Sequence, residues 1–264
     1  MMKFKIFQNL LTKIYQNKNI LIFGASKGLG KAILLNLINL NAKIYVVTSS
    51  KNCCSLKELN KLETIYLLKN QKSWEDDFEN VLKRHAIQFH YVFFNSGITQ
   101  NNNFENIEDK KIIEIFNVNL FNYIRLLKIL TRNNLLDQAA KILSISSGTS
   151  ILPSPFNSIY AASKAALDRL NRSIALEFES KIKFISVYPG YINTGFGKNK
   201  INCSSIVNRN ESLYSSPNFK AMLLLLLAPY AKKRIFIPGS YLIGLVLKLL
   251  PEKLFKQIVI RKCR

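Results

Sequence analysis

A glycine-rich turn between an apolar run and a helical pattern is the feature of the sequence that most constrains its fold. The run Asn-Ile-Leu-Ile-Phe at 19–23 has the unbroken apolar character of a strand buried in a parallel sheet. The turn Gly-Ala-Ser-Lys-Gly-Leu-Gly at 24–30 follows directly, and apolar residues recur with helical spacing over 32–38. Glycines at such a junction let the backbone approach a pyrophosphate, which the N-terminus of the next helix stabilises. The pattern predicts a nucleotide-binding turn, although an ordinary glycine-rich turn has the same residues.

Strand patterns and helical patterns alternate along most of the chain. This alternation predicts βαβ units and a parallel sheet with helices on both faces, so the expected fold class is α/β. We expect a single domain over residues 1–264. Besides the helix after the glycine turn, helices are expected at 4–16, 74–84, 110–131 and 157–179. Strands are expected at 19–23, 43–48, 64–68, 89–94, 141–146 and 184–188.

The last part of the chain, residues 191–264, has a different character. Residues 191–220 are polar and rich in turn formers, which is typical of a loop over a substrate site. The apolar runs 221–228 and 241–250 predict a helical C-terminal extension, and both are shorter than the roughly 20 residues that span a bilayer. Two interpretations stay open: helices that pack on the domain, or an apolar surface over 221–260 that contacts a membrane peripherally beside nearby lysines and arginines.

The formal net charge of +22 is concentrated at the two ends of the chain. Residues 1–57 contain nine Lys or Arg and no Asp or Glu, whereas residues 58–180 contain fourteen of each sign. Residues 181–264 contain fifteen basic residues and two acidic ones. Such an excess indicates nucleic acid, an anionic membrane, an acidic substrate, or only a compositional bias with a solvated surface. The sequence has no nucleic-acid reader motif, so we expect no nucleic-acid partner.

Cysteine and histidine usage predicts a cytoplasmic protein without a metal site. The four cysteines form no C-x-x-C pair, and the two histidines have no ligand-spaced cysteine nearby, so no zinc site is expected. The first residues carry lysines within their apolar part and lack a cleavage site for a signal peptide. A serine hydrolase is excluded by the absence of G-x-S-x-G.

Tyr160 and Lys164 are the strongest candidate pair for catalysis. They lie four residues apart in a predicted helix and therefore share one of its faces. A cation beside a phenol favours the phenolate, so we expect Lys164 to lower the pKa of Tyr160. A tyrosine tuned in this way can exchange a proton with a substrate oxygen near neutral pH.

The charges around the glycine turn predict which dinucleotide binds. Proteins that bind NAD place an acid about 20 residues after the turn, at the end of the second strand. Here that position is Ser49-Ser50-Lys51, no acid precedes Glu58, and Lys27 lies within the turn itself. A ribose 2′-phosphate would meet cations and hydroxyls there, so NADP is favoured over NAD.

Over residues 18–195 the chain resembles the short-chain dehydrogenase/reductase family. The resemblance rests on the glycine turn and on motifs in the family's order: Asn95-Ser96-Gly97, Asn119, Ser147, Tyr160-x-x-x-Lys164, and Pro189-Gly190 followed by Thr194. It implies a Rossmann-type doubly wound sheet of about seven parallel strands and NAD(P)-dependent chemistry on an alcohol or carbonyl. The sequence departs from the family pattern at Phe23, where a threonine is usual, and at Ser96 in the usual Asn-Asn-Ala-Gly motif.

The resemblance also implies roles for individual residues. Tyr160 is expected to be the general acid–base, with Lys164 lowering its pKa and holding the nicotinamide ribose. Ser147 is expected to hydrogen-bond the substrate oxygen, and Asn119 to support a water-linked proton relay. Taken together, the glycine turn, the charges and the resemblance predict cofactor contacts at Gly24, Ser26, Lys27, Gly28, Leu29, Gly30, Ser49, Ser50, Lys51, Asn95, Ser96, Gly97, Tyr160, Lys164, Pro189, Gly190, Ile192 and Thr194.

These arguments predict a cytoplasmic NADP-dependent oxidoreductase that reduces a carbonyl on a small, hydrophobic or lipid-like substrate. The basic residues would then hold an acidic or membrane-borne group of that substrate. The alternative is a catalytically silent nucleotide-binding scaffold or regulatory protein of the same fold. The helices at 110–131 and 157–179 resemble those through which family members form homodimers or homotetramers.

Overall fold

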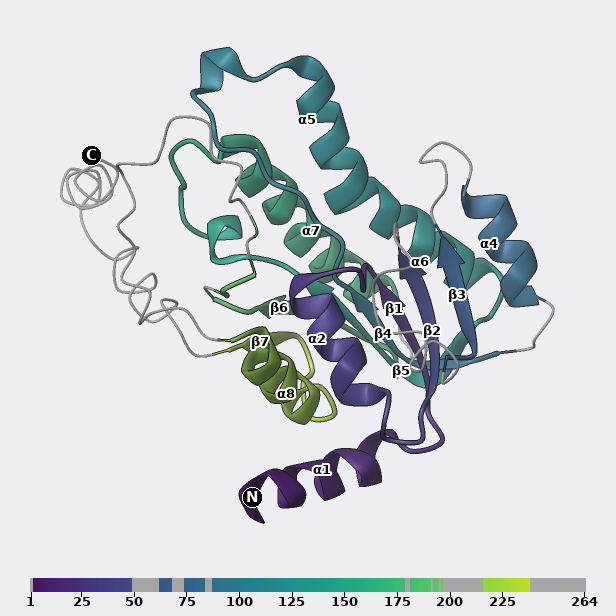
Figure 1. The fold of residues 1–264 in the computed structure, drawn as a ribbon. Helices are drawn as coiled ribbons and strands as arrows, with labels where there is room; N and C mark the ends of the chain where they lie inside the picture. Colours follow the sequence, from purple (N-terminus) through teal and green to yellow (C-terminus); the bar gives the residue numbers. More distant parts are fainter. Residues whose placement is uncertain are drawn as a thin grey trace.

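The computed structural model describes residues 2–48, 62–67, 74–83, 87–178, 181–190, 192–194, 196 and 216–237. They contain a seven-stranded sheet in which all neighbouring strands are parallel, in the order β3-β2-β1-β4-β5-β6-β7 (Figure 1). The strands are β1 (Asn19–Phe23), β2 (Lys43–Thr48), β3 (Thr64–Leu67), β4 (Phe89–Phe94), β5 (Leu136–Ile145), β6 (Lys183–Tyr188) and β7 (Arg234–Phe236). The predicted α/β class and doubly wound sheet are therefore confirmed.

The helices form a layer on each face of the sheet (Figure 1). The helices are α1 (Met2–Tyr15), α2 (Gly28–Leu37), α4 (Trp74–Lys83), α5 (Asp109–Phe116), α6 (Asn122–Arg132), α7 (Ser158–Glu177) and α8 (Pro217–Leu227). Helices α1, α2 and α8 share one hydrophobic core with one face of the sheet. Helices α4, α6 and α7 share a second core with the other face. The helical extension predicted after residue 220 is thus represented by α8, whose buried side packs on the domain.

The seventh strand is the element that sequence patterns did not locate. β7 has three residues, too few for an apolar pattern to stand out. Tertiary contacts position it: the Tyr188 ring stacks on Phe236 at 4.6 Å, and the Tyr188 hydroxyl donates a 2.5 Å hydrogen bond to the buried carboxylate of Asp168. Arg234 forms an ion pair with the same carboxylate at 3.5 Å. A residue from α7 thereby ties β6 to the edge strand.

The helix predicted at 110–131 is interrupted in its middle. A π-helical turn, η3 (Asn117–Phe121), joins α5 to α6. Such turns insert an extra residue into a helix and are frequent at functional sites. Here the turn contains the buried Asn119, one of the predicted catalytic residues.

The strand order reverses direction at β1, since β2 and β3 lie on one side of it and β4 to β7 on the other. In doubly wound sheets the ligand crevice opens at the carboxyl ends of the strands at this switch point. The turns after β1 and β4 therefore mark the expected cofactor position. Of the predicted segments, Ser49-Ser50-Lys51 and the run 241–250 lie outside the described residues, as do residues 191, 195 and 197–215 of the loop predicted at 191–220.

Candidate active site

The glycine turn after β1 adopts a conformation that requires glycine at two positions. Gly24 has φ +94° and Gly28 has φ +59°, both in the region that side chains disfavour. The Gly24 amide donates to Val47 O at 2.7 Å, and Asn95 Nδ2 donates to Gly24 O at 2.8 Å. The turn is thereby held between the ends of β2 and β4.

Gly30 lets α2 approach the turn closely. A Cβ on this residue would lie 2.0 Å from Gly24 O and 2.4 Å from Asn95 Nδ2. Neither atom belongs to a flexible chain end that can move aside, since Asn95 Nδ2 is itself bonded to Gly24 O. The first and third glycines thus form one packed unit.

The N-terminus of α2 offers donors and positive charge to an anion. Lys27 precedes the helix, is exposed, and makes no side-chain capping bond, and the first turn of α2 contains no acid. Helix N-termini bind phosphate through their free N–H groups and their dipole. Ser26 is half-buried beside Lys27, whereas the side chain of Leu29 packs in the core, which leaves only its backbone for a ligand. These residues fit the pyrophosphate of a dinucleotide.

The segment after β6 closes over the same turn. Gly190 has φ +67°, and a Cβ built on Gly28 would lie 3.2 Å from Cβ of Thr194. Thr194 therefore lies against the glycine turn, with its amide donating to Ile192 O at 3.0 Å. Pro189 is buried directly after β6, and Phe196 places its ring 5.8 Å from the ring of Tyr160. Thr194 of this segment therefore contacts the glycine turn, and Phe196 contacts Tyr160 of α7.

The segment after β4 brings two predicted catalytic residues together. The amides of Asn95 and Ser96 both donate to Phe23 O, at 2.8 Å and 3.2 Å, which fixes the end of β4 beside β1. A Cβ on Gly97 would lie 3.4 Å from Lys164 Nζ and 3.6 Å from Asn119 Oδ1. Gly97 thus faces the point where these two side chains converge.

Asn119 is held in place by hydrogen bonds on both ends of its amide. Its Oδ1 accepts from Ile98 N at 2.8 Å, and its Nδ2 donates to Ile98 O at 3.0 Å and to Ser163 Oγ at 2.9 Å. The Ser163 hydroxyl donates onward to the Tyr160 carbonyl at 2.7 Å. Asn119 therefore links the loop after β4 to α7.

Ser147, Tyr160 and Lys164 lie near one another at the carboxyl end of β5. The Ser147 side chain is close enough to the Tyr160 phenol to lower its pKa, and Lys164 Nζ lies 5.9 Å from the centre of the Tyr160 ring. Lys164 is buried and donates to Ile145 O at 2.8 Å. The Ser147 hydroxyl also accepts from Thr149 Oγ1 at 3.0 Å.

The predicted lowering of the Tyr160 pKa is wrong in this structure. Burial raises the pKa of Tyr160 to about 12, and the nearby Ser147 side chain offsets this only in part. Burial also lowers the pKa of Lys164 to about 7, because desolvation disfavours its charged form. Lys164 is then only partly charged at neutral pH, and a partly charged ammonium gives the phenolate less support than a full cation.

The buried Lys164 predicts how stability depends on pH. Between about pH 7 and its ordinary pKa of 10.5, the amine is neutral in the folded state and protonated in the unfolded state. The unfolded state then binds more protons, so the free energy of unfolding rises with pH across this window, by at most about 1.4 kcal/mol per pH unit. Urea unfolding at pH 7, 8 and 9 should show this rise in the natural protein and a smaller rise in Lys164→Met. Equal slopes in the two proteins would contradict the assignment.

Gln100 is a site residue that sequence reasoning missed. Its Oε1 accepts the Tyr160 amide hydrogen at 3.0 Å, in the first turn of α7, while Asn157 at the start of that helix makes no capping bond. Asn157 Oδ1 instead accepts from Thr99 Oγ1 at 2.8 Å. Gln100 is buried, and among the described residues its Nε2 is one of two buried side-chain N or O atoms with no partner. No sequence signal marks this cap, because Gln100 lies 60 positions before Tyr160.

Removing this cap is expected to affect the position of Tyr160. Gln100→Leu leaves the Tyr160 N–H without an acceptor, and loss of a helix cap costs about 1 kcal/mol of stability. Because the bond holds Tyr160, the predicted proton donor, kcat should fall with little change in KM. Urea unfolding and steady-state kinetics check both parts. Gln100→Glu, which keeps an acceptor, should retain most of the stability, and a KM effect alone would contradict the positioning role.

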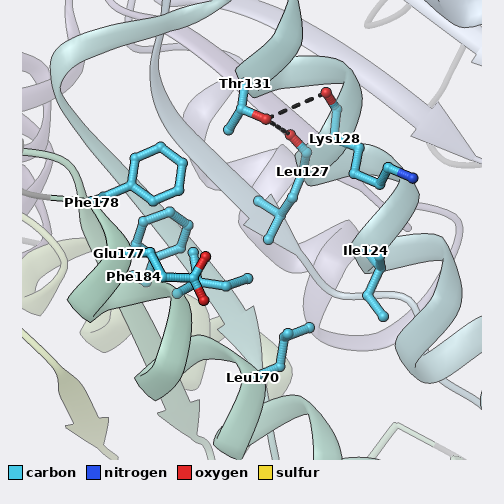
Figure 2. A pocket seen from close by; sticks show the side chains of 9 residues that line it. Ile124, Leu127, Lys128, Thr131, Leu170, Glu177, Phe178 and Phe184 are labelled. Carbon is cyan, nitrogen blue, oxygen red and sulfur yellow. Dashed lines mark hydrogen bonds between the residues drawn. The ribbon is translucent and has the colours of Figure 1, made fainter.

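A pocket elsewhere on the surface is separate from this site. It lies between α6 and α7, where Ile124, Leu127 and Leu170 border one hollow with Phe178 and Phe184 (Figure 2). None of the predicted catalytic or cofactor residues lines it. Within the described residues, no three His, Cys, Asp or Glu side chains are grouped so that they could hold a metal ion.

Comparisons with known proteins agree with this architecture. The family model for short chain dehydrogenase matches residues 18–203. The chain is 33% identical to L-xylulose reductase of Caenorhabditis elegans over 190 residues, 70% of this chain and 75% of that protein. It is 31% identical to 3-oxoacyl-[acyl-carrier-protein] reductase of Pseudomonas aeruginosa over 186 residues, 68% of this chain and 75% of that protein.

Solved structures agree on the fold. Ligand-free aldohexose dehydrogenase of Thermoplasma acidophilum superimposes with a TM-score of 0.73 at 20% identity, covering 86% of this chain and 95% of that one. At this identity the likeness concerns the fold alone, and the family follows from the sequence matches. The chain belongs to the short-chain dehydrogenase family and is an oxidoreductase that acts on CH–OH or C=O groups.

Proposed function

We propose that the protein is an NADP-dependent reductase that converts a carbonyl to an alcohol, with Tyr160 as the proton donor. The observation that carries the proposal is the grouping of Tyr160, Ser147 and Lys164 at the carboxyl ends of the strands, where the glycine turn also lies. Reduction of a carbonyl needs a hydrogen-bond donor and a proton source on the same side of the oxygen. Ser147 and Tyr160 supply these two groups.

The chain's own residues hold and move the proton. A bound nicotinamide dinucleotide supplies the hydride. The Tyr160 phenol donates its proton to the substrate oxygen, which the Ser147 hydroxyl hydrogen-bonds at the same time. Lys164, when protonated, stabilises the phenolate that remains. The proton that Tyr160 has donated is then replaced along Lys164 and Asn119, whose side chains meet next to Gly97.

The preference for NADP rests on charge around the cofactor turn. Gly24, Gly28 and Gly30 would hold the pyrophosphate at the N-terminus of α2, with Lys27 beside it. The described residues 2–48, which include β1, α2 and β2, contain no acid that would repel a 2′-phosphate. The remaining 2′-phosphate contacts of the proposal, Ser49-Ser50-Lys51, directly follow β2.

The proposed substrate is hydrophobic or lipid-like. The aromatic ring of Phe196 lies next to Tyr160, and Ile192 belongs to the same segment. An apolar wall beside the proton donor favours an apolar group on the carbonyl. One relative is a reductase of a 3-oxoacyl group, which has an acyl chain of this character.

The test is reduction measured as loss of NADPH or NADH absorbance. Carbonyl compounds with increasing alkyl chain length are each mixed with the full-length protein and one of the two cofactors. The proposal predicts turnover with NADPH, a lower KM for longer chains, and a weak rate with NADH. Preference for NADH would overturn the cofactor assignment, and absence of turnover with every compound would favour the nucleotide-binding scaffold.

We also propose that the protein forms a homodimer or homotetramer through α5, α6 and α7. This surface exposes Ile113, Phe121 and Leu176, the last with 85% of its area accessible, and includes the apolar hollow of Figure 2. Apolar side chains grouped on one face are typical of an interface between subunits. Light scattering of Leu176→Glu should show smaller particles than the natural protein, whereas equal masses would contradict this interface.

The proposed location is the cytoplasm, with peripheral membrane contact through 221–260. In the part of the chain that the structure describes, no helix has both the length and the apolar character to cross a bilayer. Of the segment proposed for this contact, Ala221 to Ile237 is described.

A further inference from the structure

The described helices near the two ends of the chain, α1, α2 and α8, contain no acidic residue and form one layer of the fold. Every Asp and Glu among the described residues lies between Glu63 and Glu177, so α1, α2, α8 and β7 contain none. Figure 1 shows α1, α2 and α8 together on one side of the sheet. The acidic residues therefore belong to the other side of the sheet and to its loops, and the excess charge is concentrated on one face.

Specific contacts hold the two ends of the chain together in this layer. The buried Tyr15 at the end of α1 donates a 2.6 Å hydrogen bond to Leu225 O in α8, although 210 residues separate them. Asn36 of α2 donates to Asn218 of α8, also at 2.6 Å. The side chains of Leu11, Leu225 and Ala221 are buried in the core that these helices share. The basic layer is thus a packed part of the domain.

The outward side of α8 is apolar as well. Phe219 and Leu227 of α8 are exposed, and so is Tyr230 in the turn that follows the helix, whereas Leu223 is half-buried against the core. Phe219 is 48% exposed, Leu227 40% and Tyr230 73%, whereas Leu224 on the opposite side is fully buried. A helix that is apolar on both sides needs a second apolar environment besides the core.

Four exposed lysines lie at or near the amino ends of the strands, and two of them, Lys232 and Lys233, closely follow the exposed Tyr230 in sequence. Lys232 and Lys233 directly precede β7, Lys43 begins β2, and Lys13 lies in the last turn of α1. All four are exposed. The candidate active site lies at the opposite, carboxyl-end edge, so a partner bound here leaves the active site open.

We propose that this basic, apolar face binds the surface of an anionic lipid bilayer, with α8 as the inserted element and Lys232 and Lys233 on lipid headgroups. The proposal deepens the peripheral membrane contact proposed above and is independent of the reductase chemistry. An anionic bilayer offers both a negative surface and an apolar layer below it, which matches exposed lysines together with exposed Phe219, Leu227 and Tyr230. Nucleic acid offers the negative charge but no environment for an aliphatic side chain such as Leu227.

The test is retention of the full-length protein by vesicles of phosphatidylcholine with and without phosphatidylserine, measured by cosedimentation. The natural protein should bind the anionic vesicles at low salt and be released at high salt, because the charges are then screened. Lys232→Gln/Lys233→Gln should weaken binding about 30-fold, since each lysine near an anionic surface contributes roughly a factor of five. Leu227→Gln/Tyr230→Ser should weaken it too, through loss of insertion.

A matched control comes from the opposite layer. Lys110 of α5 and Lys128 of α6 are exposed, so Lys110→Gln/Lys128→Gln removes the same charge and should leave vesicle binding unchanged. NADPH oxidation with a soluble carbonyl should be equal in all these variants, which separates loss of docking from loss of the proposed reductase function. Any of three outcomes would overturn the proposal. They are equal binding to neutral and anionic vesicles, equal weakening of binding by both pairs of lysine substitutions, and tighter binding to single-stranded RNA than to the vesicles.

Discussion

Replacing Tyr160 by Phe is expected to lower kcat for carbonyl reduction by about 10²- to 10⁴-fold, the contribution of a positioned proton donor. The substitution removes the phenol hydroxyl near Ser147 and keeps the ring that lies against Phe196. The backbone bonds of residue 160 to Gln100 and Ser163 also remain, so α7 should keep its position. The measurement is NADPH oxidation at saturating carbonyl substrate.

Cofactor binding is the internal control for this variant. Tyr160→Phe should bind NADPH with nearly unchanged affinity, measured by cofactor fluorescence, because the glycine turn and Lys164 are intact. Its unfolding should also remain close to that of the natural protein. If kcat remained within a few fold of the natural value, Tyr160 would not be the proton donor. If the natural protein itself bound NADPH without turnover, the scaffold interpretation would hold.

Replacing Gly30 by Ala is expected to disrupt the cofactor turn. The added Cβ would lie 2.0 Å from Gly24 O and 2.4 Å from Asn95 Nδ2, so α2 must move away from the ends of β1 and β4. Forcing a methyl group into a packed contact costs about 1–3 kcal/mol of stability. The same movement displaces the helix N-terminus from the pyrophosphate, and we expect the Kd for NADPH to rise about tenfold or more, which corresponds to 1.4 kcal/mol.

Gly148→Ala is the matched control for that substitution. A Cβ on Gly148 has no atom within 4 Å, and the residue lies in a short 3-10 turn with no positive φ. Urea unfolding and NADPH titration of both variants separate a steric effect at the turn from a general effect of adding a methyl group. Equal stability and affinity of Gly30→Ala and the natural protein would contradict the close packing of α2 on the turn.

Much of the fold could be predicted from local patterns, and the exceptions have physical causes. The strands at 19–23, 43–48 and 89–94 have the predicted bounds because each is a continuous apolar run buried on both faces. β5 begins at Leu136, earlier than expected, because its first half is partly exposed and so lacks the apolar run. The π turn at Asn119 was also missed, because an inserted residue in a helix changes the side-chain pattern too little to be visible.

The candidate site also contains residues that could be predicted from local patterns and one that could not. Glycines and the Tyr160/Lys164 pair were visible because their chemistry requires particular residues at short spacings. Gln100 was not visible in the sequence, because its hydrogen bond is to Tyr160, which lies 60 residues later. The pKa of Tyr160 was predicted with the wrong sign, because burial around both side chains cannot be seen in a spacing of four residues.

The sequence by itself determined most of the succession of strands and helices, the glycine turn and the choice of candidate catalytic side chains, since these depend on local periodicity and residue type. The tertiary structure alone decided which distant segments meet. Hydrogen bonding of Tyr15 to Leu225 brings α1 and α8 into one layer, and the fold brings Lys164 of α7 and Asn119 together beside Gly97 after β4. Both outcomes depend on packing between segments far apart in the chain, which no local pattern encodes.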